Sequence, residues 1–301
     1  MAILDSAETI GPQHVQLLRS AFSQADKQAW CYFAPFLCCF SLLPGREVQI
    51  LQQEGAICLI VRRGESIDLV IPPVPFSTRS LELVRMEVSK KSDRSPRILW
   101  VDESDANKLG TDHWEIKAKD KEYMYSPSRI LAAEGKPFKD LRKRLNRFAR
   151  EEKAQFREIR EADISECHSL LRHWRRRQGR KQPFLLDWGY TRAALDRYFE
   201  FDRADLRGWC VEVDDTLSGF AMAGPMNANL ASFFIAKADP DIRGLSEYLR
   251  MQVYQALSDY SFVNDAGDLG LAGLHQSKSK FRPLFQLPVF GAEYSPGGAS
   301  N

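Results

Sequence analysis

The order of strand-like and helix-like segments in the second half of the chain constrains its fold more than any other feature. Apolar residues alternate with a period of two in the strand-like segments and recur every three to four residues in the helix-like ones. In chain order, the sequence predicts a strand at 156–161, helices at about 164–178 and 191–202, strands at 209–213, 218–224 and 230–238, a helix at about 244–260 and a strand at 261–264. Three strands in close succession favour antiparallel pairing, so we expect a mostly antiparallel sheet flanked by helices.

The first half of the chain also alternates helices and strands. Its expected elements are a helix at about 12–26, strands at 56–63 and 66–73 joined at Gly64-Glu65, a helix at 81–90, and strands at 97–103, near 113–117 and near 122–126. The chain is therefore expected to have an α+β fold with mixed sheets. The element order of the second half resembles that of the GNAT acyltransferase fold, a resemblance that concerns the fold and not the function.

Positive charge is concentrated in the middle of the chain. The net charge of the 301 residues is only +2, yet residues 135–181 contain sixteen lysines and arginines against seven acidic residues. A chain of this length, with 44% apolar residues, is long enough for two domains with separate cores. We place the boundary at the start of the basic segment, which predicts one domain at 1–134 and a catalytic domain at 135–301.

Residues 136–154 are predicted to form an amphipathic basic helix. Four apolar residues recur at helical spacing: Phe138, Leu141, Leu145 and Phe148. Lysines and arginines occupy its other faces, and the run 172–181 adds further cations around Trp174. Because arginine binds phosphate oxygens in pairs, such a surface fits a phosphate-rich partner, either nucleic acid or anionic lipid head groups. A charged helix face in contact with solvent is the alternative.

The turn before Gly244 lies where GNAT enzymes bind acyl-CoA. In those enzymes the backbone N–H groups at the start of this helix bind the pyrophosphate. Their motif has arginine or glutamine three residues before the glycine, whereas this chain has Asp241 there and Asp239 two residues earlier. Two carboxylates beside a pyrophosphate would weaken binding, so the sequence disfavours ordinary CoA use. The same two residues are also typical of a helix N-terminus.

The stretch 264–283 combines glycines with cations directly after a predicted strand. Asn264 could hydrogen-bond a substrate carbonyl or amine, and Gly267, Gly270 and Gly273 permit close turns. Three cations then follow within five residues: Lys278, Lys280 and Arg282. A lysine ammonium can stabilise the oxyanion or the departing hydroxyl in acyl transfer from an ester. A glycine-rich loop with solvated lysines is the alternative.

Two blocks of the sequence follow patterns that are characteristic of one protein family. The pattern Asn-x-x-x-Asp-x-Gly-x-x-Gly-Leu-x-x-x-Lys-x-x-Tyr-x-Pro is carried by Asn264, Asp268, Gly270, Gly273, Leu274, Lys278, Phe281 and Pro283. The pattern Gly-Lys-x-x-x-x-Leu-Arg-x-x-x-Asn-x-Phe is carried by Gly135, Lys136, Leu141, Arg142, Asn146 and Phe148. Weaker matches are Ile71-Pro72-Pro73, Tyr123-Met124-Tyr125 and Trp174. In these residues the chain resembles the C-terminal catalytic domain of phosphatidylglycerol lysyltransferases and their stand-alone relatives.

The resemblance implies a tandem pair of GNAT-like domains and transfer of an aminoacyl group from aminoacyl-tRNA to the hydroxyl or amine of an acceptor. It implies catalytic roles for Lys278, Asn264 and Asp268, with Lys278 stabilising the ester that is broken. The residues expected to bind the substrate or tRNA are Lys136, Arg142, Arg144, Asn146, Arg147, Arg175, Arg176, Arg243 and Gly244. Neither a cofactor nor a metal is expected, and the acceptor is a small molecule or a lipid, with peripheral membrane contact left open.

Besides Phe281, which occupies the tyrosine position of the motif, the chain departs from the family pattern at three positions. Ala266 stands where stand-alone members usually have glutamate, and Asn229 and Ser232 stand where lipid-acting members have an Asp-x-x-Arg pair. These departures leave the amino acid and the acceptor undefined and keep two alternatives open. One is a CoA-dependent N-acyltransferase, and the other is an inactive module that binds nucleic acid or anionic membranes.

Other sequence features point to the cytoplasm. The segment 1–11 lacks the pattern of a secretory signal, and the six cysteines show no C-x-x-C spacing, which predicts reduced thiols. The most apolar run, 30–43, contains Pro35 and is too short to span a bilayer, which requires about 20 residues. We expect this run to be a buried core segment, with a lid that touches a membrane as the alternative.

Overall fold

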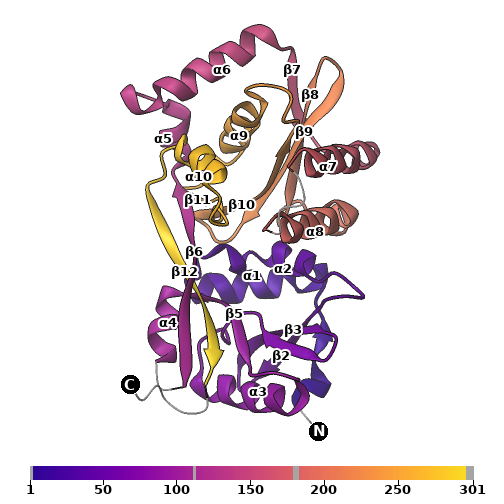
Figure 1. The fold of residues 1–301 in the computed structure, drawn as a ribbon, viewed down its shortest axis with the longest axis vertical. Helices are drawn as coiled ribbons and strands as arrows, with labels where there is room; N and C mark the ends of the chain where they lie inside the picture. The colour runs from indigo at the N-terminus through magenta and orange to yellow at the C-terminus, as the bar shows by residue number, and fades with distance from the viewer. Residues whose placement is uncertain (1–2, 111–112, 179–182, 296–301) are drawn as a thin grey trace. The chain divides into compact units, whose positions relative to one another are not determined.

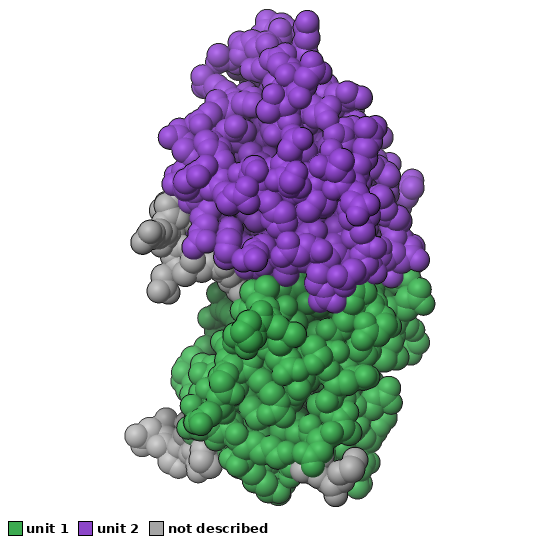
Figure 2. All heavy atoms as spheres, turned by 90° about the vertical axis from the view of Figure 1, so that its right-hand side faces the viewer, with its two compact units in different colours: residues 1–121, 287–301 green, residues 122–286 purple. Residues whose placement is uncertain are grey.

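The computed structural model describes residues 3–110, 113–178 and 183–295, and the chain forms two compact units. Unit 1 comprises residues 1–121 and 287–301, and unit 2 comprises residues 122–286 (Figure 2). The bounds differ from the predicted domains 1–134 and 135–301. Two long strands account for the difference, because β6 (Trp114–Tyr125) and β12 (Phe285–Tyr294) each contribute residues to both units.

Unit 1 contains a mixed sheet with the strand order β1-β2-β3-β4-β5-β12. Its strands, besides β12, are β1 (Glu8–Thr9), β2 (Glu47–Gln53), β3 (Ala56–Arg63), β4 (Ser66–Leu69) and β5 (Arg97–Asp102). Its helices are α1 (Val15–Gln24), α2 (Ala34–Phe40), α3 (Thr78–Lys91) and α4 (Glu103–Leu109), with 3-10 turns at Ile3–Ser6, Pro12–His14 and Trp30–Tyr32. The β4–β5 pair is parallel, and the other described pairs of this sheet are antiparallel.

Local chemistry explains where the helices of unit 1 begin. The side chains of Ser77 and Asp102 accept hydrogen bonds from the backbone N–H groups of Ser80 and Asp105, which caps α3 and α4. All seven side chains of α2 are buried, as expected for the apolar run 30–43 as a core segment. Among the described residues, no helix is long and apolar enough to cross a membrane.

Unit 2 contains strands in the order β6-β11-β10-β9-β8-β7. Its strands, besides the end of β6, are β7 (Ala154–Glu158), β8 (Arg207–Val213), β9 (Thr216–Pro225), β10 (Leu230–Ala238) and β11 (Phe262–Asn264). Its helices are α5 (Pro127–Ala132), α6 (Lys139–Glu151), α7 (Ile164–Gln178), α8 (Pro183–Asp196), α9 (Leu245–Ala256) and α10 (Ala272–Ser279), with 3-10 turns at Lys136–Phe138, Glu161–Asp163 and Tyr198–Glu200.

Helices cover both faces of the strands of unit 2. Helix α9 packs on one face of β9 and β10, and α7 packs on the other (Figure 1). The core between α6, α9 and the sheet includes Leu141, Phe148, Leu249 and Phe233. Strand β10 pairs in parallel with β11 only from Leu230 to Ser232, so its remaining residues extend past the end of that pairing. The order β10-α9-β11 agrees with the strand-helix-strand order predicted from the sequence.

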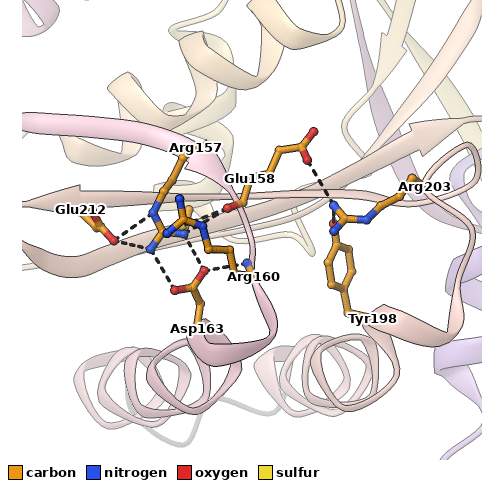
Figure 3. Close-up of polar contacts among 8 residues, drawn as sticks. Arg157, Glu158, Arg160, Asp163, Tyr198, Arg203 and Glu212 are labelled. Carbon is orange, nitrogen blue, oxygen red and sulfur yellow. Dashed lines mark hydrogen bonds and ion pairs between the residues drawn. The ribbon is translucent and has the colours of Figure 1, made fainter.

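An arginine connects β7 to its neighbours in unit 2 (Figure 3). The Arg157 guanidinium donates to both carboxylate oxygens of Asp163, at 2.6 and 2.9 Å, and its Nε donates to Glu212 on β8 at 3.0 Å. The Asp163 carboxylate also accepts the backbone N–H of Arg160 at 2.7 Å. Because Arg157 donates to it, the pKa of Asp163 lies below its usual range even though burial opposes this. The network therefore fixes the edge strand to the turn that precedes α7.

The predicted fold class is confirmed, with mixed and mostly antiparallel sheets flanked by helices. Several element predictions differ from the structure: the strand expected at 66–73 ends at Leu69, and β2 and β12 were not predicted. The two short strands near 113–117 and 122–126 are one strand, β6, and the helix expected from 191 begins at Pro183. Residues 272–279, expected to be part of a loop, form α10.

Candidate functional site

A basic pocket of about 520 Å³ lies between α6, the start of α9 and the end of α10. Cations dominate its lining: Lys143, Arg144, Arg147, Arg243, Lys280 and Arg282. The other lining residues are Pro137, Asp140, Leu141, Gly244, Gln276 and Ser279. The pocket therefore brings together three regions that the sequence analysis treated separately, namely the basic helix, the turn at Gly244 and the stretch 264–283.

Packing of α6 against α9 sets the position of the pocket. Leu141 and Phe148 are buried on one face of α6, which directs the cations of the other faces away from the core. Gly244 immediately precedes α9 with a φ of +94°, a conformation that favours glycine. A Cβ at this position would lie 3.2 Å from the Cβ of Phe148, so glycine allows α9 to begin directly against α6.

The pocket is strongly positive because its acidic residues are fewer than its cations. Glu247, buried in the first turn of α9, is 2.9 Å from the Lys280 ammonium and 3.7 Å from the Arg144 guanidinium. Arg147 is paired with Glu151 at 2.8 Å on the exposed surface of α6, a pair that contributes little to stability. A multiply charged anion can replace these weak exposed contacts, so the arrangement is suited to bind phosphate groups.

The two carboxylates before Gly244 interact with α7. Asp241 forms an ion pair with Arg177 and lies 3.3 Å from the Nε2 of His173, and Asp239 lies 3.5 Å from the same nitrogen. These three groups are close enough to be metal ligands, but Arg177 already neutralises Asp241. We therefore interpret the group as ion pairs that fix the turn to α7. Because Arg177 pairs with Asp241, the repulsion between this carboxylate and a bound phosphate is smaller.

Lys278 belongs to a buried charged cluster and does not line the basic pocket. Its ammonium donates to the backbone carbonyl of Asp265 and lies 3.2 Å from a carboxylate oxygen of the same residue. The other carboxylate oxygen of Asp265 accepts from Arg250 of α9. Burial opposes the charged form of Arg250, but Asp265 outweighs it and raises the pKa of the guanidinium. Two cations thus share one carboxylate in the interior.

Helices α9 and α10 each contribute residues to both the pocket and the buried cluster. On α9, Glu247 contacts pocket cations, and Arg250, three residues later on the same face, contacts Asp265. On α10, Gln276 and Ser279 line the pocket, while Lys278 points into the cluster. A ligand that moves either helix would therefore change the position of the Lys278 ammonium.

A second network fixes the start of α10. The Tyr123 hydroxyl donates to Asp268 at 2.6 Å and lies 2.6 Å from Nδ1 of His275, which is 3.1 Å from Asp268. Burial alone would raise the pKa of Asp268, but the hydrogen bonds from Tyr123, Gly270 and His275 lower it. Asp268 therefore remains ionised and anchors α10 to β6, a structural contact for a residue that we predicted to be catalytic.

Asn264 lies on the opposite face of the sheet from Lys278. Its side-chain amide donates to Glu122 at 2.7 Å, and both residues are buried. The next residue, Asp265, points to α9, as strand alternation requires. The structure thus brings Lys278 and Asp268 to one side of β11 with α10 and places Asn264 on the other side.

The remaining predicted binding residues occupy different environments. Arg144, Arg147, Arg243 and Gly244 line the basic pocket, as described above, whereas Lys136 and Asn146 are exposed outside its lining. The Arg142 guanidinium donates to the backbone carbonyls of Ala133 and Gly135, which stabilises the turn between α5 and α6.

The predicted cations of α7 lie elsewhere. Arg175 lies 4.2 Å from the ring of Trp188, Arg176 is exposed, and positions 179–181 of the basic run fall outside the described residues.

Sequence reasoning missed the partners that surround Lys278. Asp265 directly follows Asn264, but an isolated aspartate after a strand carries no signal of its own. Glu247 and Arg250 are three residues apart in a predicted helix, a spacing that indicates a shared face but not what that face contacts. Lys280 and Arg282 were visible in the motif, and only their position in the pocket distinguishes them from solvated lysines and arginines.

The element order of unit 2 and its cationic pocket at the start of α9 define a protein of the GNAT-like class. The chain belongs to the family described as phosphatidylglycerol lysyltransferase, C-terminal, whose model matches residues 45–293. Among curated protein sequences, none matches this chain.

Three solved structures show the same fold over nearly the whole chain. A conserved protein of unknown function from Bacteroides thetaiotaomicron is 18% identical, with a TM-score of 0.82 over 96% of this chain and 99% of that one. L-PGS from Bacillus licheniformis is 15% identical, with a TM-score of 0.65 over 95% and 92% of the two chains. A tandem GNAT protein from the clavulanic acid biosynthesis pathway is 11% identical, with a TM-score of 0.51 over 97% and 98% of the two chains.

Proposed function

We propose that the protein is an aminoacyltransferase that moves an amino acid from aminoacyl-tRNA to the hydroxyl or amine of a small-molecule or lipid acceptor. The observation that carries the proposal is the basic pocket, in which six cations converge at the start of α9. Family membership supports an acyl-transfer reaction, and the pocket supports a polyanionic substrate. Aminoacyl-tRNA is the co-substrate, no cofactor or metal takes part, and the reaction takes place in the cytoplasm.

In the proposed reaction the acceptor attacks the ester directly. Its oxygen or nitrogen forms a bond to the carbonyl carbon, the ester C–O bond breaks, and the proton of the acceptor passes to the ribose hydroxyl that leaves. We assign to Lys278 the stabilisation of negative charge on the ester oxygens. Asp265 and Arg250 position its ammonium, and the pocket cations bind the phosphates of the tRNA.

The direct test is transfer from charged tRNA. The purified protein is incubated with tRNA charged with one radiolabelled amino acid at a time, together with a lipid extract or a small-metabolite extract. We expect label to move from tRNA into one of the two extracts for a limited set of amino acids. Arg144→Gln with Arg147→Gln should reduce transfer at limiting tRNA more than at saturating tRNA, because these residues bind rather than react.

Two controls make this result interpretable. Heat-treated protein measures spontaneous hydrolysis of the ester, and N-acetylated aminoacyl-tRNA tests whether the free α-amine matters. If no amino acid moves from tRNA into either extract, while the protein is folded and binds tRNA, the proposed reaction is wrong and a binding module becomes the better description.

A CoA-dependent N-acyltransferase is a second candidate that one observation favours. Asp241 is paired with Arg177 of α7, so it opposes a pyrophosphate at Gly244 less than the sequence alone indicates. Acetyl-CoA would then raise the melting temperature of the protein, and charged tRNA would not. The opposite result would favour the aminoacyl-tRNA substrate.

A further inference from the structure

A second pocket, of about 300 Å³, lies between α7 and α8 in unit 2. We call it the tryptophan groove, and it is lined by His168, Leu171, Arg172, Trp188, Arg192 and Asp196. None of these residues lines the basic pocket, and the proposed function does not use them. The groove therefore needs its own explanation.

The aromatic ring of the groove lies among arginines. The Arg175 guanidinium lies 4.2 Å from the ring centroid of Trp188, and that of Arg192 lies 5.8 Å from it. Such cation–π contacts hold a planar guanidinium beside a planar ring. The buried indole Nε1 of Trp188 has no acceptor among the described residues, although buried donors in proteins are nearly always paired. The groove thus offers an aromatic surface beside positive charge.

Positive charge exceeds negative charge in the groove. Asp196, half exposed, is 2.9 Å from Nε2 of His168 and 3.6 Å from Arg192, so internal contacts already occupy its carboxylate. The guanidinium of Arg172 donates to Ser169 at 2.8 Å and is exposed. Its remaining N–H groups are suited to an anionic oxygen at the edge of the groove.

We propose that the tryptophan groove binds one unpaired nucleotide of an RNA strand. A base has a planar surface that can stack on Trp188, and its phosphate can be bound by Arg172 and Arg192. The volume is at the lower end of the range for small-ligand pockets, which suits a single nucleotide. That the strand is a tRNA rests on the proposed function. The same chemistry fits a free mononucleotide, and the experiment separates these sources.

The Trp188 indole provides a direct measurement. Protein labelled with ¹⁵N-tryptophan gives one indole N–H resonance per tryptophan, and Trp188→Phe identifies the one that belongs to the groove. The full chain is titrated with AMP, inorganic phosphate and a single-stranded RNA hexamer. We expect the Trp188 resonance to shift with the RNA, and more weakly with AMP, while the Trp174 resonance on α7 stays in place.

A matched pair of variants tests the role of charge. Arg172→Gln should weaken binding of the hexamer about tenfold, because it removes one charge-assisted contact to a phosphate. Arg203→Gln removes an exposed arginine of unit 2 that lies outside both pockets and should change this affinity less than twofold. Both residues are solvent-exposed, so neither change should prevent folding.

Each result decides between clear alternatives. A shift with RNA alone supports the site and identifies a strand as its ligand, and a comparable shift with AMP supports it and identifies a mononucleotide. A shift with inorganic phosphate that equals the RNA shift overturns the nucleotide assignment, and no shift with any probe overturns the site. If the RNA shift occurs but no charged tRNA donates an amino acid, the groove stands and the proposed reaction fails. If transfer occurs without any shift of the Trp188 resonance, the proposed reaction stands and the groove assignment fails.

Discussion

Lys278 is a buried ammonium whose position depends on one carboxylate. Its contacts to the backbone and side chain of Asp265 place it beside Arg250, and its side chain is 5% exposed. A charge in this environment is costly unless it is paired, and removing one partner from a buried pair costs about 3–5 kcal/mol. Lys278 therefore contributes to stability as well as to the proposed chemistry, and the two effects must be measured separately.

We expect Lys278→Ala to abolish aminoacyl transfer and to lower the melting temperature, because Asp265 loses one of its two cations. Lys278→Arg keeps a cation and should restore most of the melting temperature, but its larger head group moves the donor, so transfer should remain low. Thermal denaturation and initial transfer rates well below the melting temperature separate the two effects. Transfer at the wild-type rate in Lys278→Ala would show that the proposed role of this residue is wrong.

The Arg157–Asp163 pair makes stability depend on pH. Because the folded pKa of Asp163 is lowered by Arg157, the carboxylate stabilises the fold above its unfolded pKa of about 3.9. That contribution is lost as the pH falls through the lower folded value. We expect Asp163→Asn to reduce the free energy of unfolding at pH 7 by about 1–3 kcal/mol, with the difference shrinking below about pH 4. Urea denaturation at several pH values measures this, and a difference that does not change with pH would contradict it.

Helix α10 shows how packing determines an element. Its sequence, AGLHQSKS, contains a glycine, and its N-cap residue, Leu271, provides no side-chain hydrogen bond. A helix of 8 residues is marginal in water, so propensity alone does not predict it. The burial of Lys278 and Phe281 and the contact of Tyr123 with His275 stabilise it in the folded chain.

At the scale of elements, α6 is expected to contribute most of the affinity for tRNA. The double change Arg144→Gln with Arg147→Gln should weaken tRNA binding about tenfold or more and reduce the slope of log affinity against log salt by about 2, since each phosphate contact contributes roughly one. Lys139→Gln with Arg150→Gln removes two cations of the same helix outside the pocket and is the matched control. Equal losses in both double variants, measured by filter binding, would indicate a diffuse charge effect.

At the scale of the whole molecule, the chain crosses between its compact units twice. Unit 2 requires the end of β6, because Tyr123 and Tyr125 belong to its core and Met124 pairs with Asn264 of β11. Unit 1 in turn includes the chain after residue 286. A division at residue 134 would remove the strand next to β11 from unit 2.

This arrangement predicts which fragment folds. The fragment 122–286 should unfold in a single cooperative thermal transition, because it retains β6 residues beside β11. The fragment 135–301 should lack such a transition, because it loses Glu122, Tyr123 and Tyr125 from buried positions. Circular dichroism during heating distinguishes the two. A cooperative transition in 135–301 with the same midpoint would support the boundary expected from the charge distribution.

The sequence by itself determined the fold class, the order of elements in unit 2 and the cationic character of α6. These properties follow from local patterns, namely apolar periodicity, helix spacing and charge density, which are visible in consecutive residues. Family motifs also identified Lys278, Asp268 and Asn264 as candidates.

Only the tertiary structure decided which of these residues meet. The basic pocket brings Arg144 together with Gly244 and Lys280, which follow it by a hundred residues or more in the sequence. Strand alternation separates Asn264 from Lys278. The tertiary structure also decided that Asp241 pairs with Arg177 of α7, and that β6 and β12 each contribute residues to both units. Contacts between distant segments depend on packing, so no local pattern in the sequence contains them.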